Sequence, residues 1–213
     1  MISALEALKR LREGNDRFAS QVSGAEAPLI GGRRLVLTQD QSPFAIVLGC
    51  SDARVPAEIV FDQGLGDLFV IRVAGNIVAP SQIGSVEFAA ARFGTRLVVV
   101  LGHSQCGAVL ATLEELARPT GSHSRHMQSI VDRVRPAVEG LVETTSGGDA
   151  TLARRAVRAN IRASANQLRH GSQVLEQLIQ QEGLLVVGAE YSVENGTVDF
   201  FDGVPGELRR GGA

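Results

Sequence analysis

The sequence predicts an α/β protein with a central, mostly parallel β-sheet flanked by helices, a helical arm at the N-terminus and a β-hairpin at the C-terminus. Two observations support this fold class. Short apolar runs alternate along the chain with stretches of helical periodicity, and continuous apolar runs are typical of parallel strands that are buried on both faces. The expected strands are FAIVLG (44–49), LFVIRV (68–73), RLVVVLG (96–102) and LLVVGAEY (184–191).

The length and composition of the chain limit the classes of function. Its 213 residues suit a single domain (1–213), and 44% of them are hydrophobic, as in an ordinary globular protein. A formal net charge of -2 gives no electrostatic reason to bind nucleic acid or an anionic membrane surface. The charged start of the chain is unlike a secretory signal, and no apolar stretch approaches the roughly 20 residues of a membrane span. We therefore expect a cytoplasmic protein with a small-molecule partner and reduced cysteines.

The first element is an amphipathic helix. Ser3-Ala4-Leu5-Glu6 reads as a capping box, and Leu5, Leu8 and Leu11 form an apolar stripe that is expected to end near Gly14. Such a stripe must be buried, either against the protein's own core or against a neighbouring subunit. The helix belongs to an N-terminal arm, residues 1–40, that precedes the first strand.

The remaining helices are predicted from the same helical spacing of apolar residues. Between the second and third strands, residues 81–93 place apolar side chains on one face, and Gly94 is a stop signal. Residues 144–149 read as a surface linker, and the Asn-Gly pair at 195–196 between alternating residues predicts the terminal hairpin. After the third strand, helices are expected at 106–117, about 124–141, 150–169 and 172–182.

Reactive side chains follow two of the four strands. Cys50 comes directly after the first strand, and His103 and Cys106 come after the third. Because ligands bind in the crevice at the carboxyl ends of an open parallel sheet, these three residues are expected to converge. A single cysteine at a strand end is more often a small buried hydrophobe, but two at equivalent ends with a nearby histidine favour a metal site. A Cys2His set with one further position fits tetrahedral zinc.

Asp52 and Arg54 determine whether the fourth coordination position of the zinc is open to water. If Arg54 holds the Asp52 carboxylate in a paired hydrogen bond, the fourth position is free for water and the site is catalytic. If Asp52 turns to the zinc, the site is closed. An alternative without any metal is an aspartate at the start of a helix beside a solvated arginine.

Ser104 offers a rival chemistry. Gly102-His103-Ser104-Gln105-Cys106 follows a strand and opens a helix, as a serine nucleophile elbow does. The fifth position of that motif requires glycine for its strained turn, and a cysteine stands there. The motif is therefore a poor match to a serine hydrolase.

Three motifs together closely resemble those of the β-class carbonic anhydrases. They are Cys-Ser-Asp-Ala-Arg-Val-Pro at 50–56, the pair Asp-Leu-Phe-Val-Ile-Arg at 67–72 and Ala-Gly-Asn at 74–76, and Gly-His-Ser-Gln-Cys-Gly at 102–107. The similarity runs from residues 13–18 to the final hairpin. It implies reversible hydration of CO2 to bicarbonate and a proton by a zinc-bound hydroxide, with one zinc per subunit.

The resemblance also implies the roles of individual residues. Zinc would be held by Cys50, His103 and Cys106, with Asp52 and Arg54 as a gating dyad in which Asp52 becomes the fourth ligand only in a closed state. Two anionic thiolates donate more charge than imidazoles, so activity should favour alkaline pH. Alternatives on the same scaffold are a CS2 or COS hydrolase and a non-catalytic zinc protein that Asp52 keeps closed.

The resemblance further implies a substrate pocket and an assembly. Gln41, Phe69 and Phe88 match a plant-like pocket in which an amide that can bind CO2 or bicarbonate stands beside apolar walls. Members of the family form homodimers whose N-terminal helices pack on the partner, and dimers often pair into homotetramers. The expected assembly is therefore a homodimer or a homotetramer, with residues 1–40 as the arm that contacts the partner subunit.

Overall fold

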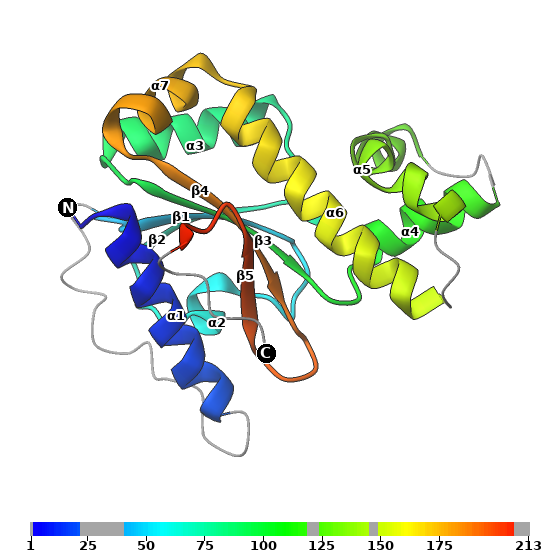
Figure 1. Cartoon of the computed structure of the whole chain (residues 1–213), viewed down its shortest axis with the longest axis horizontal. Coiled ribbons are helices and arrows are strands. Elements are labelled where there is room, and N and C mark those ends of the chain that lie inside the picture. Colours follow the sequence, from blue (N-terminus) through cyan, green and yellow to red (C-terminus); the bar gives the residue numbers. More distant parts are fainter. Residues whose placement is uncertain (1, 22–40, 119–123, 145–148, 207–213) are drawn as a thin grey trace.

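The computed structural model describes residues 2–21, 41–118, 124–144 and 149–206, and it contains a five-stranded sheet (Figure 1). The strand order is β2-β1-β3-β4-β5, in which the first four strands are parallel and β5 pairs antiparallel with β4. The predicted fold class, including the C-terminal antiparallel pair, is confirmed. The strands are β1 (Ala45–Gly49), β2 (Leu68–Arg72), β3 (Leu97–His103), β4 (Leu185–Tyr191) and β5 (Val198–Asp202).

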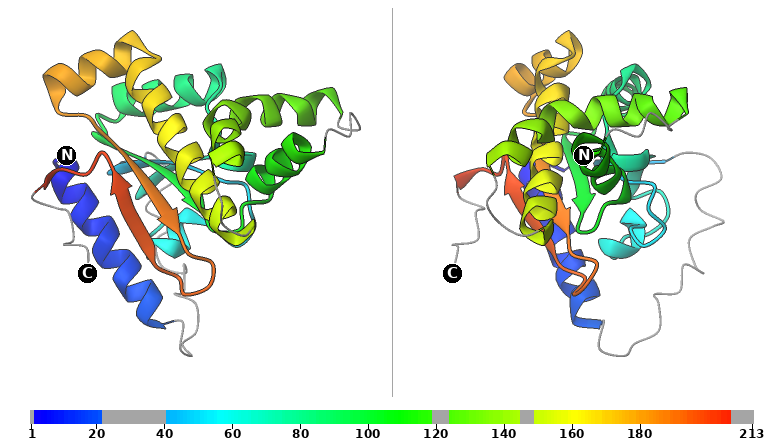
Figure 2. Two further views of the ribbon diagram at one scale, coloured as in Figure 1. Left: turned by 45° about the vertical axis from the view of Figure 1, so that its right-hand side comes forward. Right: turned by 90° about the vertical axis from the view of Figure 1, so that its right-hand side faces the viewer.

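Helices cover both faces of this sheet (Figure 1). The helices α1 and α2 pack on one face, and the residues of α3, α4, α5, α6 and α7 form the core on the other. Figure 2 shows α4 and α5 lying together, away from α1. The helices are α1 (Ala4–Gln21), α2 (Ala57–Val60), the 3-10 helix η2 (Ala74–Asn76), α3 (Pro80–Arg92), α4 (Gly107–Ala117), α5 (Arg125–Thr144), α6 (Asp149–His170) and α7 (Gln173–Glu182).

Two of these elements are absent from the sequence prediction. Both α2 and η2 are about one turn long, which is too short for a hydrophobic periodicity to appear. Of the predicted linker 144–149, residues 145–148 lie outside the described part of the chain. Within the described residues, no helix combines the length and the apolar character needed to cross a membrane.

Helix α1 packs on its own sheet. Leu8 and Leu11 are completely buried in the core that includes Val47 and Phe61, whereas Leu5 is 43% exposed. The sequence leaves open whether the apolar stripe is buried against the protein's own core or against a neighbouring subunit. Leu8 and Leu11 are buried against the protein's own core. Contact of the arm with a partner subunit stays a prediction, and residues 22–40 of the arm lie outside the described residues.

The predicted end of this helix near Gly14 is wrong, because α1 continues to Gln21. Gly14 lies where the helix crosses the carbonyl of Phe61, and a Cβ atom built on it would be 1.9 Å from that oxygen. Asn15 reinforces the crossing, since its amide donates to the carbonyl of Val60 at 3.1 Å. The glycine thus serves close packing of α1 on the α2 segment and does not end the helix.

Replacing Gly14 with alanine is expected to lower the free energy of unfolding by about 1–3 kcal/mol, because a backbone carbonyl cannot move away as a flexible side chain can. Urea unfolding measures the change. Gly140→Ala is the matched control: apart from the backbone of its own helix, no atom of the described residues lies within 4 Å of its Cβ position on the exposed face of α5, so alanine should stabilise by up to about 1 kcal/mol. Equal unfolding energies for the two variants would contradict the close-approach explanation.

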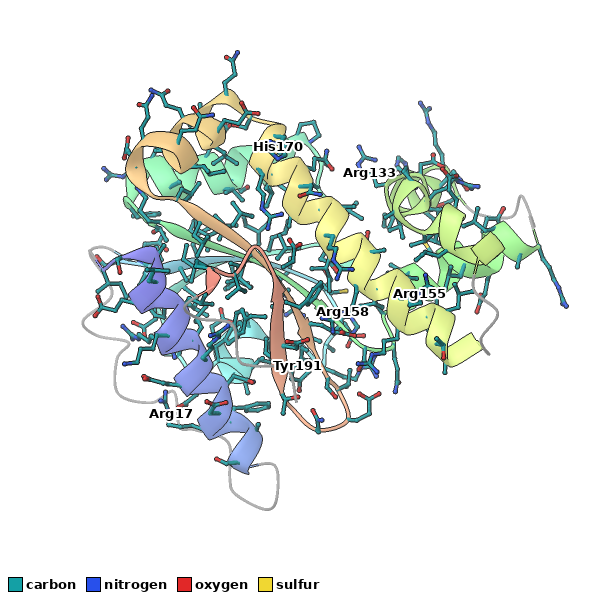
Figure 3. All side chains as sticks on the ribbon, in the orientation of Figure 1. Arg17, Arg133, Arg155, Arg158, His170 and Tyr191 are labelled. Carbon is teal, nitrogen blue, oxygen red and sulfur yellow. The ribbon has the colours of Figure 1, made fainter. Side chains whose placement is uncertain are left out.

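The C-terminal strand pair is tied to α6 by arginines. Arg158, labelled in Figure 3, reaches from α6 to Glu190 on β4 at 3.2 Å and to Asp199 on β5 at 2.9 Å. Its guanidinium also lies 3.8 Å from the centre of the Phe201 ring. These contacts hold the β4–β5 hairpin against the rest of the fold.

Candidate metal centre

The sequence-predicted ligands meet at the centre of the sheet. Because β1 lies between β2 and β3, the strand order reverses at the β1–β3 junction, where an open sheet forms its crevice. Cys50 follows β1, His103 is the last residue of β3, and Cys106 immediately precedes α4. All three are buried, and their ligand atoms lie within 4.8 Å of one another. The structure therefore brings together two sulfurs and an imidazole from residues far apart in sequence.

The imidazole of His103 presents one free nitrogen. Its Nδ1 lies 2.8 Å from the carbonyl oxygen of Ser104, which can only accept a hydrogen bond, so Nδ1 carries the proton. Its Nε2 is buried without a hydrogen-bond partner among the described residues. A buried polar atom is rarely left in this state unless it binds something, and a neutral imidazole held through Nδ1 is well suited to bind a metal through Nε2.

The thiols of Cys50 and Cys106 are hydrogen-bonded to each other. A hydrogen bond from Cys106 lowers the pKa of Cys50, and the same bond together with burial raises the pKa of Cys106. The backbone N–H of Gly75 also donates to the Cys50 sulfur at 3.4 Å, and the carbonyl of Gly75 accepts from the Asn160 amide at 2.8 Å. Together with the free imidazole nitrogen, two closely spaced sulfurs are a donor set that fits a divalent, thiophilic metal ion.

Asp52 lies beside this donor set and is held by Arg54. The Arg54 side chain donates to both carboxylate oxygens, at 2.9 and 2.8 Å, and its backbone N–H donates to Oδ1 at 3.0 Å. These hydrogen bonds hold the pKa of Asp52 well below its usual range, so it is a carboxylate. Oδ2 is 3.8 Å from Nε2 of His103. The carboxylate thus faces this donor set while both of its oxygens accept hydrogen bonds from the guanidinium.

Arg72 supports the loop that carries Cys50 and Asp52, a role that the sequence motifs alone do not indicate. From the last position of β2, its Nε donates to the carbonyl of Cys50 at 3.0 Å, and its Nη2 donates to the carbonyl of Asp52 at 2.6 Å. The parallel register pairs Arg72 with Gly49, so the side chain is level with the start of the loop. Arg72 therefore fixes the backbone that carries Cys50 and Asp52.

The three residues matched to a substrate pocket lie apart from this loop along the strands. Phe69 pairs in register with Ile46, near the start of β2, and its ring packs on those of Phe88 and Phe93 at centroid distances of 6.2 and 6.1 Å. Phe88 is 54% exposed. Gln41 is exposed and precedes the amino end of β1, whereas Cys50 follows its carboxyl end. The aromatic pair is formed within one chain, and Gln41 lies at the opposite end of β1 from the metal centre.

Ser104 is engaged away from the imidazole. Its hydroxyl donates to the carboxylate of Glu194 at 2.8 Å and accepts from the backbone N–H of Val193 at 3.0 Å. The ring of His103 contacts the Ser104 carbonyl and not its hydroxyl. This arrangement lacks the serine–histidine hydrogen bond of a nucleophile elbow, and it reveals Glu194, which no sequence motif identifies.

Comparison with known proteins agrees with this geometry. The sequence pattern of the family described as carbonic anhydrase matches residues 45–198. The chain is 38% identical over 200 residues to the carbonic anhydrase of Mycolicibacterium smegmatis, covering 91% of each chain. It is 35% identical over 194 residues to carbonic anhydrase 2 of Mycobacterium tuberculosis, covering 89% of each.

A solved structure shows the same architecture. The β-carbonic anhydrase CafA of Aspergillus fumigatus superimposes with a TM-score of 0.72 at 25% sequence identity, covering 95% of this chain and 92% of that one. Sequence pattern, relatives over most of the chain and fold all agree. The chain therefore belongs to the β-class carbonic anhydrase family.

Proposed function

We propose that this protein catalyses the reversible hydration of CO2 to bicarbonate and a proton, with one zinc ion per chain held by Cys50, His103 and Cys106. The observation that carries the proposal is the buried cluster of two sulfurs and one free imidazole nitrogen at the carboxyl ends of β1 and β3. Ligands of one tetrahedral zinc lie about 3.5 Å apart, given bond lengths of roughly 2.0–2.3 Å, and the observed spread accommodates this. Three protein ligands leave a fourth position for the reaction.

The metal would activate the water, and the residues of the chain would orient it. Bound zinc lowers the pKa of water and so supplies a nucleophile near neutral pH. Asp52, ionised and held by Arg54, offers only acceptor oxygens. A water or hydroxide beside Asp52 would donate a hydrogen bond to this carboxylate, which would leave an oxygen lone pair available for the substrate. Asp52 thereby orients the nucleophile.

Arg54 and Arg72 keep that carboxylate in place. The paired hydrogen bonds of Arg54 occupy both oxygens of Asp52, which disfavours rotation of the carboxylate onto the metal. Arg72 fixes the backbone of Asp52 by donating a hydrogen bond to its carbonyl. The arrangement supports a catalytic site over the closed, non-catalytic alternative. Since Asp52 retains 19% side-chain exposure, the released proton can pass to buffer from this side.

The residues assigned to the substrate pocket favour a site completed by a second copy of the chain. The length of β1, about 16 Å, separates Gln41 from Cys50 within one chain. A homodimer can place Gln41 and the Phe69–Phe88 pair of one subunit near the metal centre of the other. In this proposal the amide binds CO2 or bicarbonate and the rings provide an apolar wall.

The proposed dimer contact is the edge of the sheet at β2. Among the described residues β2 has a strand neighbour on one side only, and such an edge can pair with another chain. The exposed ring of Phe88 adds apolar surface beside it. We propose a homodimer formed at this edge, which can pair further into a homotetramer.

Phe88→Arg is expected to shift the protein from dimer or tetramer towards monomer, because burying a guanidinium in the contact is unfavourable. Sedimentation velocity measures the distribution of mass. Met127→Arg is the matched control, since Met127 is 42% exposed on α5, which packs chiefly on α4 and α6 rather than on α3 or β2. If Phe88→Arg sediments like the unmodified protein, the contact lies elsewhere.

The direct test of the function combines zinc content with stopped-flow CO2 hydration across pH. We expect about one zinc per chain and hydration that increases towards alkaline pH, because two thiolates leave the pKa of the active water above about 7. CS2 and COS should turn over more slowly than CO2. Zinc-containing protein without CO2 hydration at any pH would refute the proposal, and faster turnover of the sulfur compounds would assign the alternative hydrolase. A cytoplasmic location, proposed because the site needs reduced cysteines, is tested by cell fractionation.

A further inference from the structure

The turn that carries two of the three ligands has an unfavourable backbone conformation. Between His103 and Cys106 the chain must reverse from β3 into α4, and Gln105 adopts a φ of 57°, in the left-handed region that favours glycine. A residue with a side chain stays in this region only where surrounding contacts hold it there. The position of Cys106 relative to His103 depends on this residue.

Glu194 supplies those contacts from the β4–β5 connection. One carboxylate oxygen accepts from the Gln105 amide at 2.6 Å, and the other accepts from the Ser104 hydroxyl at 2.8 Å and from the Ser192 hydroxyl at 2.9 Å. Hydrogen bonds from Ser104, Ser192 and Gln105 lower the pKa of Glu194 to about 2. A single carboxylate therefore joins the ligand turn to the hairpin.

The link continues from Ser104 to the metal ligand. The backbone N–H of Ser104 donates to the Tyr191 carbonyl at 2.9 Å, and the Ser104 hydroxyl accepts from the Val193 N–H at 3.0 Å. Ser104 is thus held through both its backbone N–H and its side-chain hydroxyl, and its carbonyl accepts a hydrogen bond from Nδ1 of His103. The orientation of that carbonyl sets the plane of the imidazole and the direction of Nε2.

We propose that Glu194 is a positioning residue for the metal centre: by holding Ser104 and Gln105 it orients the imidazole of His103 and sets its distance from Cys106. The inference rests on the proposed metal site. Glu194 itself is exposed and its carboxylate is turned to the two side chains of the ligand turn, so it acts through them. Partners that orient metal ligands typically change metal affinity by 10- to 100-fold when removed.

The test compares zinc affinity, measured by competition with a chromophoric chelator, in the full-length protein and its variants. Glu194→Ala should weaken zinc binding about tenfold or more. Glu194→Gln keeps one acceptor oxygen and should fall between the alanine variant and the unmodified protein. Glu139→Gln and Glu139→Ala, on the exposed face of α5, are the matched controls and should bind zinc as the unmodified protein does.

A second readout separates positioning from a general loss of stability. With cobalt at saturation, Glu194→Ala should show an altered ligand-field spectrum, because the geometry around the ion has changed. A merely structural role would lower the thermal midpoint of the metal-free protein and leave the spectrum of the saturated protein unchanged. That pattern would overturn the proposal.

A double-mutant cycle tests the route through Ser104. If Glu194 acts partly by holding Ser104, the double variant Ser104→Ala/Glu194→Ala should lose less zinc affinity than the product of the two single losses. Full additivity, or unchanged affinity in Glu194→Ala, would refute the positioning role. Failure of the unmodified protein to bind zinc would instead refute the proposed function, so the two failures are distinguishable.

Discussion

Replacing Cys106 with alanine is expected to remove both zinc and CO2 hydration. The substitution leaves one sulfur and one imidazole, and metal affinity should fall by several orders of magnitude because two ligands replace three. Zinc content should decrease from about one per chain to near zero, and hydration should decrease to the uncatalysed background. Metal analysis of the purified protein and stopped-flow hydration measure the two effects together.

Val109→Ala is the matched control for this substitution. Val109 is as deeply buried as Cys106 and lies in the adjoining turn of α4, so its truncation should cost about 1–3 kcal/mol of stability while zinc and activity are retained. Circular dichroism checks that both variants are folded. CO2 hydration at the normal rate by zinc-free Cys106→Ala protein would exclude a mechanism that depends on the metal.

Asp52→Asn is expected to separate binding from catalysis. The amide is nearly the same size as the carboxylate, but it has one acceptor oxygen and no charge, so it cannot keep the paired hydrogen bonds with Arg54 or orient the nucleophile. Zinc content should stay near one per chain, while kcat falls about 100-fold, within the range for loss of a positioned proton acceptor. The measurement is kcat at several pH values together with metal analysis.

A second arginine–aspartate pair, Arg17 and Asp62, provides the matched control for Asp52→Asn. Asp62 accepts from Arg17 at 2.6 Å on the α1 side of the molecule, so Asp62→Asn makes the same chemical change in another arginine–aspartate pair. That variant should keep its kcat. If Asp52→Asn hydrates CO2 at the unmodified rate, the gating and orienting role of the dyad is wrong; if it loses zinc, Asp52 contributes to the metal shell directly.

Much of the fold follows from local sequence because its strands are buried on both faces. A parallel strand between two helical layers needs continuous apolar residues, so runs such as 44–49 and 96–102 locate β1 and β3 to within one residue. The end of α1 could not be predicted in the same way. Gly14 resembles a stop signal in sequence, and only the crossing of Phe61 explains why a glycine lies inside the helix.

The same distinction applies to the metal centre. Convergence of Cys50, His103 and Cys106 could be predicted because each lies at or just after the end of a strand, and the carboxyl ends of parallel strands meet at one edge of the sheet. Arg72 and Glu194 could not be assigned to that centre, because they contact it through backbone carbonyls and through the hairpin. Such contacts depend on strand register and turn geometry, which leave no motif in the chain.

The position of the three proposed metal ligands at the β1–β3 junction would also affect how long the folded protein persists. Cys50 belongs to the half of the sheet that contains β2 and β1, whereas His103 and Cys106 belong to the half that continues into β4 and β5. An ion bound by all three would act as a removable cross-link between the halves and would close the long chain segment from residue 50 to residue 103. The rate of metal release would then set the lifetime of the native state.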